Sequence, residues 1–227
     1  MEIAVINTTK DLTRFLAGTV TELFSEQGFS LKRDRHFEKN SDTGRVYRYS
    51  IKVSKNKGWF SLHLTLHLLD TPLMKDVNKV LKETLSDKAL TYPDSFSESM
   101  IEDIIKTRTS NNVVAELTDW RVLKDSGETL DEFNARFSIW LFSFDQLNEK
   151  PDWKEQLSNS VIFAIEWFTT ADSDYWIKAN TVYPSLYLLS KQSTPAHMNA
   201  RYEHLLKKAA NRRELEFFYR HVNRHMQ

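Results

Sequence analysis

The stretch RVYRYSIKVSKNKGWFSLHLTLHLLD, residues 45–70, decides the fold that the sequence predicts. From Trp59 to Leu68, polar or aromatic residues alternate with apolar ones. Successive side chains of a strand point to opposite faces, so this alternation predicts a sheet with one buried and one solvated face. Residues 45–54 alternate in the same way, and Asn56-Lys57-Gly58 supplies turn residues between the two runs. The stretch therefore predicts a β-hairpin.

The residues on either side extend this hairpin into an α+β unit. Residues 31–38 are expected to form another strand, joined to the hairpin by the turn residues 40–44. Before it, Thr8 or Thr9 can cap a helix whose apolar residues recur every three or four positions. Gly28 follows the last turn, where a left-handed cap favours glycine. Residues 113–123 are either a fourth strand or an irregular crossing.

The rest of the chain has mainly helical periodicity. Helices are expected at 72–87, 97–105, 128–149, 152–169, 172–189 and 195–206, and a last one after Asn211. Pro184 should break or kink the helix that contains it. The predicted fold class is α+β: a three- to four-stranded antiparallel meander packed by an N-terminal helix, followed by a mainly helical C-terminal half. We expect a single domain, 1–227, with a possible subdivision into 1–125 and 126–227.

Composition narrows the class of protein. The 227 residues include no cysteine, which excludes disulfides and thiolate metal sites. The first residues lack the basic start and apolar run of a signal peptide. No apolar stretch approaches the roughly 18 residues of a membrane span. We therefore expect a soluble, cytoplasmic protein without a membrane partner.

Charge is distributed unevenly although the net charge is +0. Residues 31–58 contain nine Lys and Arg against three acidic residues, and residues 200–227 contain seven against three. Residues 94–155 contain fourteen acidic residues against seven basic ones. Part of the first basic segment falls on the solvated face of the hairpin. The candidate binding residues there are Arg48, Lys52, Trp59, His63 and His67.

This solvated face has two interpretations. Cations with an aromatic ring and histidines could hold RNA phosphates and stack bases. Alternatively, the face is charged only because it is solvated, and lysine on edge strands prevents pairing between sheets. His63 and His67 lie roughly 13 Å apart on a strand, so they cannot share a metal ion. His221 and His225 on a helix could form half a metal site. A frayed C-terminal helix end that binds no metal is the simpler interpretation of these two residues.

The sequence contains no specific catalytic motif. Its glycines are isolated, so there is no glycine-rich phosphate loop, and no serine is flanked by glycines as a hydrolase nucleophile would be. We therefore predict no catalytic residue, no metal and no cofactor. The enzyme question stays open, with a non-enzymatic role favoured over an unrecognised hydrolase.

One resemblance rests on the order of elements. An amphipathic helix ends in Gly28-Phe29 and is followed by RDRHFEK (33–39), YRYSIKVSKN (47–56) and WFSLHLTLHL (59–68), with a late Trp167-Phe168. This order resembles a family of uncharacterised bacterial domains, some of which accompany toxin systems as immunity proteins. The likeness covers residues 8–70 and, more weakly, 160–190. The family pattern has no agreed catalytic residue, so none is transferred.

These observations lead to one hypothesis and an alternative from another class. The first is a non-enzymatic intracellular protein-binding module, plausibly toxin-neutralising, whose acidic segment 94–155 could mimic nucleic acid towards a basic nuclease. Its expected partner is another protein. The alternative is an RNA-binding domain that uses the basic sheet face.

Overall fold

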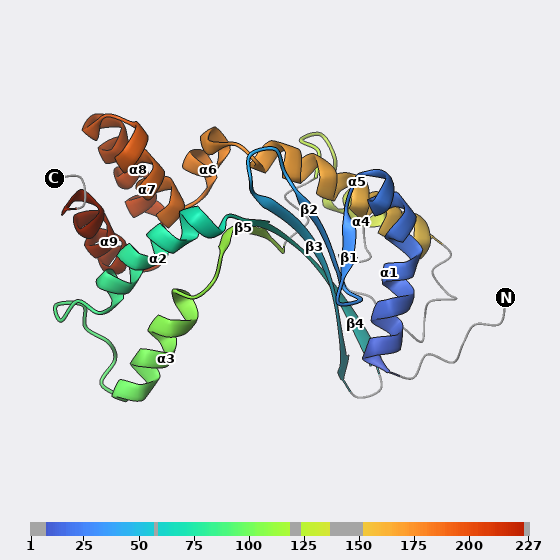
Figure 1. Ribbon diagram of the computed structural model, residues 1–227, viewed down its shortest axis with the longest axis horizontal. Coiled ribbons are helices and arrows are strands. Elements are labelled where there is room, and N and C mark those ends of the chain that lie inside the picture. The colour runs from blue at the N-terminus through green and yellow to red at the C-terminus, as the bar shows by residue number, and fades with distance from the viewer. Residues whose placement is uncertain (1–7, 57–58, 119–123, 137–151, 225–227) are drawn as a thin grey trace. The chain divides into compact units, whose positions relative to one another are not determined.

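The computed structural model describes residues 8–56, 59–118, 124–136 and 152–224 (Figure 1). The chain divides into two compact units, each built from two separate stretches. Unit 1 comprises residues 1–68 and 116–171, and unit 2 comprises residues 69–115 and 172–227. Within the described ranges, no helix combines the length and the apolarity that a membrane crossing requires.

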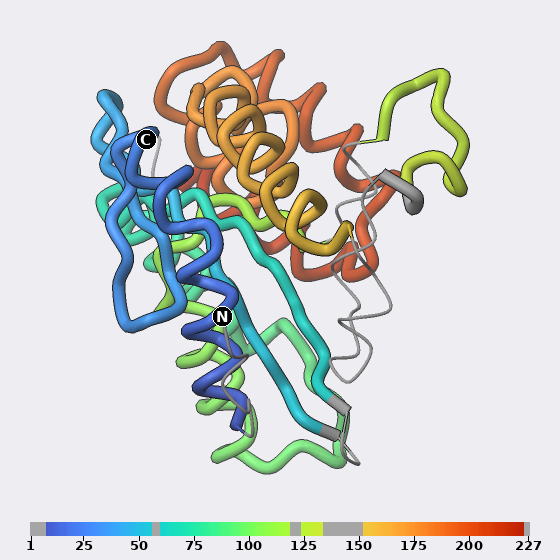
Figure 2. Tube along the Cα trace, turned by 90° about the vertical axis from the view of Figure 1, so that its right-hand side faces the viewer, coloured from blue at the N-terminus to red at the C-terminus, as the bar shows by residue number. Residues whose placement is uncertain are grey.

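Unit 1 is built on an antiparallel sheet, which confirms the predicted α+β class. The strand order is β1-β2-β3-β4-β5, and all five follow one another in the sequence. The bounds are Ser30–Lys32, His36–Asn40, Val46–Asn56, Trp59–Leu69 and Val113–Leu117. The strands β3 and β4 are the longest and run side by side (Figure 2). They are the predicted hairpin.

The sheet has more strands than predicted because residues 31–38 do not form one strand. They form β1, a tight turn and the start of β2, in which Lys32 pairs with His36. Arg33 and Asp34 adopt φ values of 51° and 57° in the left-handed region. Two such residues in succession, closed by the bond from Arg35 N to Lys32 O at 3.2 Å, match a type I′ turn. That turn usually contains Asn-Gly or Asp-Gly, and this sequence has neither. The strand β5 is the fourth strand that the sequence offers as one alternative for residues 113–123.

The helix α1 (Thr9–Glu26) begins and ends as its sequence predicts. Thr8 accepts a hydrogen bond from the backbone N–H of Asp11 and caps the first turn. At the other end Gly28, with φ of 78°, donates to Ser25 O, and Phe29 N donates to Phe24 O. This pair of bonds is the Schellman motif, and the expected apolar contact accompanies it. The rings of Phe24 and Phe29 lie 5.1 Å apart.

The core of unit 1 lies between one face of the sheet and two helices, α1 and α5 (Trp153–Ala171) (Figure 1). Phe24 of α1 stacks on Phe37 of β2 at 4.3 Å and contacts Tyr49 of β3 at 4.8 Å. Tyr47 stacks on Phe168 of α5 at 4.9 Å. This aromatic layer is the buried face that the alternation predicts, and we call the opposite side of the sheet the outer face.

Unit 2 is helical apart from its part of β5. It contains α2 (Thr71–Leu85), α3 (Glu98–Arg108), α6 (Asp174–Asn180), α7 (Tyr183–Gln192), α8 (Pro195–Lys208) and α9 (Arg212–Arg224). Pro184 lies in the first turn of α7, so it ends the predicted long helix as expected. The helix α2 packs against α7 and α9. The mainly helical C-terminal half is therefore confirmed.

One remaining helix, α4 (Leu130–Arg136), belongs to unit 1. It is the described part of the helix predicted at 128–149, and the continuation of that helix lies outside the described residues. The buried ring of Phe133 on α4 is consistent with an amphipathic segment.

Candidate functional site

The outer face of the sheet carries a row of polar side chains that are hydrogen-bonded in pairs. We call these pairs the bonded row: His36–Ser50, Glu38–Arg48 and His67–Glu116. The register of β2 and β3 places His36 opposite Ser50 and Glu38 opposite Arg48. Arg48 Nε donates to Glu38 Oε1 at 2.6 Å. Their side chains are 33% and 24% exposed, so this ion pair is partly shielded from water. Cross-strand pairs of this kind fix the orientation of both partners.

The hydrogen bonds of His36 define its tautomer. Arg35 Nε donates to His36 Nε2 at 3.0 Å, so this nitrogen carries a lone pair. The proton of the neutral ring is then on Nδ1, which donates to Ser50 Oγ at 2.9 Å. Burial, together with the positive charges of Arg35 and Arg48, lowers the pKa of His36 to about 4. The ring is therefore neutral at physiological pH.

A second imidazole continues the row on β4 and β5. Glu116 of β5 accepts a hydrogen bond from His67 Nε2 at 3.2 Å. The other ring nitrogen, Nδ1, is buried without a hydrogen-bond partner. Burial lowers the pKa of His67, against the opposing effect of Glu116, and Arg48 lowers it further. The charge of Arg48 acts on both histidines, so all three groups share one electrostatic environment.

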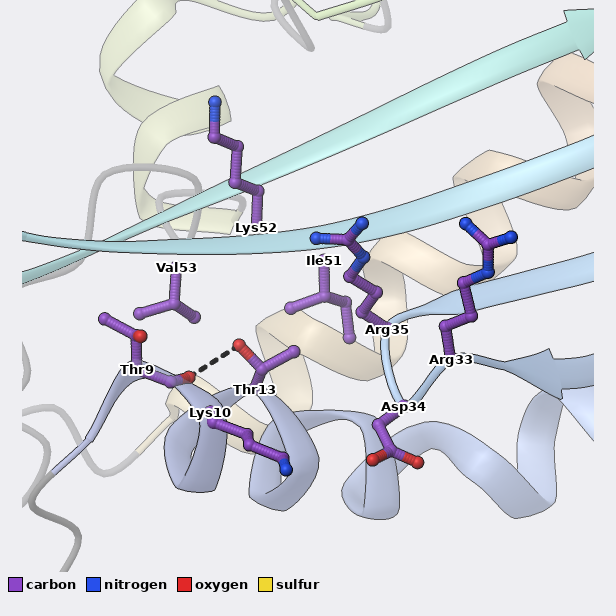
Figure 3. Close-up of a pocket in the computed structure, with 9 residues that line it drawn as sticks. All are labelled: Thr9, Lys10, Thr13, Arg33, Asp34, Arg35, Ile51, Lys52 and Val53. Atoms are coloured by element: carbon purple, nitrogen blue, oxygen red, sulfur yellow. Dashed lines mark hydrogen bonds between the residues drawn. The ribbon is translucent and has the colours of Figure 1, made fainter.

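The predicted binding residues are only partly brought together. Arg48 and His67 belong to the bonded row, whereas the side chains of Lys52 and His63 are exposed. Figure 3 shows Lys52 directed away from Ile51 and Val53, as strand alternation requires. The side chain of Trp59 lies outside the described residues.

Four members of the row were missed by sequence reasoning: His36, Glu38, Ser50 and Glu116. His36 and Glu38 fall in the segment predicted as a single strand, where the tight turn reverses the chain. Glu116 falls in the segment 113–123, whose structure the sequence leaves open. A charged residue flanked by apolar ones in VVAEL is the signal that could have indicated a strand there.

The corner of the sheet beside α1 is basic. A cavity of about 320 Å³ lies among α1, the turn after β1 and the middle of β3. Arg33 and Arg35 extend toward the level of β3, while Asp34 turns toward α1 (Figure 3). Asp34 forms an ion pair with Arg14 at 3.2 Å. Arg33 forms no hydrogen bond or ion pair with the described part of the chain. We call Arg33, Arg35 and Lys52 the basic corner.

Most of the other cations in residues 31–58 have partners in the folded chain. The ammonium of Lys39 lies 5.9 Å from the ring centre of Phe29, and that of Lys55 lies 5.0 Å from Phe60. Arg45 is buried. The two ring contacts fix the positions of the Lys39 and Lys55 charges without neutralising them, whereas Arg45 is withdrawn from the surface.

Unit 2 contains a buried carboxylate that could be mistaken for an active site. Glu214 accepts from both terminal nitrogens of Arg108, at 2.6 and 2.7 Å, and from the hydroxyl of Tyr183. Burial raises the pKa of Glu214, but hydrogen bonds from Arg108 and Tyr183 outweigh it and lower the pKa overall. Asn211 also donates to it at 3.3 Å. A carboxylate satisfied in this way anchors α9 to α3 and α7 and has little capacity left for a substrate.

No metal-binding cluster is found in the described ranges. Among residues 8–56, 59–118, 124–136 and 152–224, no group of three or more His, Asp or Glu side chains is arranged to hold a metal ion. Comparison with protein-family models, curated proteins and solved structures finds no match to the chain. The outer face of the sheet, with the basic corner beside it, is the strongest candidate functional site.

Proposed function

We propose that this protein is a non-enzymatic protein-binding module whose partner docks on the outer face of the sheet. The supporting observation is the bonded row itself. The pairs Arg48–Glu38 and His67–Glu116 already orient its polar and charged groups. Binding a partner therefore costs little additional side-chain conformational entropy. A toxin-neutralising role, in which the partner is a toxin, is the specific form of this proposal.

The charge pattern of the face favours a protein partner over RNA. The carboxylates of Glu38 and Glu116 lie among its cations and would repel a phosphate chain. A protein surface, in contrast, can present both signs of charge to match.

The partner should carry acidic residues where it meets the basic corner. Arg33 and Lys52 have no partner in the described part of the chain, and Arg35 is bonded only to a neutral imidazole there. Unsatisfied cations at the edge of a docking surface accelerate association with an acidic partner and raise its dependence on salt.

The predicted nucleic-acid mimicry by residues 94–155 receives less support. These residues are divided between the two units, with 94–115 in unit 2 and 116–155 in unit 1. Residues 119–123 and 137–151 of this segment also lie outside the described residues. We therefore build the proposal on the outer face, whose contacts the structure describes.

Isothermal titration against the product of the neighbouring gene tests the proposal. Lys52→Glu should weaken binding by about tenfold or more, because it reverses a charge at the interface. Lys88→Glu makes the same change on an exposed loop of unit 2 and should leave the affinity within about twofold. Equal affinities of the two variants would reject the outer face, and no binding by the unaltered protein would reject this partner.

The alternative, RNA binding, is favoured by one observation about the basic corner. Asp34 is the one acid among the described residues that line the cavity there, and it is held by Arg14. A fluorescence-anisotropy titration with mixed-sequence single-stranded RNA tests it. Binding that weakens steeply with salt and is lost in the Arg48→Ala, Lys52→Ala double variant would replace the protein-binding proposal. A flat response would eliminate the alternative.

A further inference from the structure

A groove lies within unit 2. It runs between α2 and the loop 109–112, which joins α3 to β5, and its volume is about 430 Å³. This volume falls within the roughly 300–1,000 Å³ that small-molecule sites occupy. Both walls belong to residues 69–115, so the groove is formed within a single stretch of unit 2.

Three lysines form one wall of the groove. Lys75, Lys79 and Lys82 occupy positions i, i+4 and i+7 of α2 and therefore share one helix face. All three are exposed, and none forms a hydrogen bond or ion pair with the described part of the chain. Of the acids on α2, Asp76 accepts from Tyr187 at 3.0 Å and Glu83 also has partners of its own. Among the described residues, the three ammonium groups of the lysine row are therefore not held in ion pairs and can contact an anion.

The opposite wall is neutral and held in place by hydrogen bonds. Asn112 Nδ2 donates to Thr71 Oγ1 at 3.1 Å. The backbone carbonyl of Asn112 accepts a hydrogen bond from Asp70 N at 3.0 Å. Asn111 accepts from Val113 N at 3.2 Å through its side chain. No carboxylate lines the groove among the described residues. The loop is fixed and repels no anion.

Asn78, one of the residues that line the groove, carries a buried hydrogen-bond acceptor. Asn78 is only 8% exposed, and its Nδ2 donates to the carbonyl of Asn111 at 2.6 Å. A carbonyl can only accept, so this bond fixes which end of the amide is nitrogen. The oxygen, Oδ1, consequently has no hydrogen-bond partner. A buried unpaired acceptor is costly and gains from any donor that reaches it.

We propose that this groove binds a small phosphate ester that carries a free hydroxyl, such as a sugar phosphate. The lysine row contacts the phosphate, and Asn78 Oδ1 accepts from the hydroxyl. Lys75 to Lys82 span about 10 Å at 1.5 Å per residue, which suits one phosphate and one sugar rather than a long strand. This site is independent of the protein-binding function proposed above.

Titration calorimetry with three probes tests the proposal: inorganic phosphate, ribose 5-phosphate and ribose. Ribose 5-phosphate should bind at least about tenfold more tightly than phosphate, because it also satisfies the buried acceptor. Ribose alone should show no binding, since it lacks the charge that the lysines require. Equal affinities for phosphate and ribose 5-phosphate would overturn the role of Asn78, and no binding of either would overturn the site.

Matched variants separate the two contacts. Lys79→Gln, in the middle of the row, should weaken both phosphate and ribose 5-phosphate by about tenfold, whereas Lys88→Gln outside the groove should weaken neither. Asn78→Ala should reduce ribose 5-phosphate binding to the level of phosphate. Because Asn78 also anchors the loop, circular dichroism must confirm that the Asn78→Ala variant is folded. If that variant unfolds, Lys79→Gln still tests whether the groove binds phosphate.

A short single-stranded RNA serves as the last probe. If it binds through the lysine row more tightly than ribose 5-phosphate, the small-ester proposal is wrong and the groove is a nucleic-acid contact. If it binds no more tightly, the groove is a site for a small phosphate ester.

Discussion

The same methyl group, added at two glycines near α1, should change stability in opposite directions. Gly18 lies inside α1, and no heavy atom comes within 4 Å of a Cβ built there. Gly18→Ala should therefore stabilise the protein by about 0.8–1 kcal/mol, the difference in helix propensity. Gly28 has φ of 78°, and Gly28→Ala should cost roughly 1–2 kcal/mol because Cβ crowds the backbone in that region.

The surroundings of Gly28 add nothing to this cost. The nearest atom to its built Cβ is Lys39 Cε at 3.8 Å, an ordinary contact at the end of a flexible side chain. The predicted separation between the two variants is thus about 2–3 kcal/mol and arises from the backbone alone.

Denaturant unfolding followed by circular dichroism measures the two free energies. Gly28→Asn is the matched control, because asparagine is larger than alanine yet tolerates the left-handed region. It should cost less than Gly28→Ala. If Gly28→Ala is as stable as the unaltered protein, or if Asn costs more than Ala, the Schellman motif at the end of α1 is not what holds Phe29 against Phe24.

Two further predictions concern the core and the row of histidines. Ser160 donates its only hydroxyl proton to Leu157 O at 2.6 Å. The Tyr49 hydroxyl, 2.7 Å from Ser160 Oγ, must therefore be the donor of the bond between them. Tyr49→Phe removes this bond and should lower the free energy of unfolding by about 1 kcal/mol, measured by thermal or denaturant unfolding. A cost near zero would mean that this buried bond contributes nothing. His36 has a folded pKa of about 4 against about 6.5 unfolded, so the unfolded chain binds its proton first and stability should fall as pH drops from 6.5 to 4. Because the ring is partly exposed, the loss should be about 1 kcal/mol; His36→Gln should reduce this pH dependence, and an unchanged slope would contradict the assigned pKa.

Local sequence patterns determined the elements of this protein. The alternation of residues 59–69 is a property of one strand, and it predicts both the buried leucines and the outward direction of His63 and His67. The cap at Thr8 and the motif at Gly28 are likewise closed by residues a few positions away. Interactions within one turn or one strand depend on neighbours that the sequence lists in order, so they could be predicted.

The candidate sites depended on tertiary structure, because their members come from distant parts of the chain. Glu116 meets His67 across 49 positions, and Asn78 meets Asn111 across 33. The turn at Arg33 and Asp34 lacks the glycine that usually marks such a conformation, so no local signal predicted it. Strand register and helix packing determine which cations are paired and which acceptor is left unpaired. The free energy that stabilises this arrangement is a sum over contacts between residues distant in sequence, so the sequence alone does not reveal it.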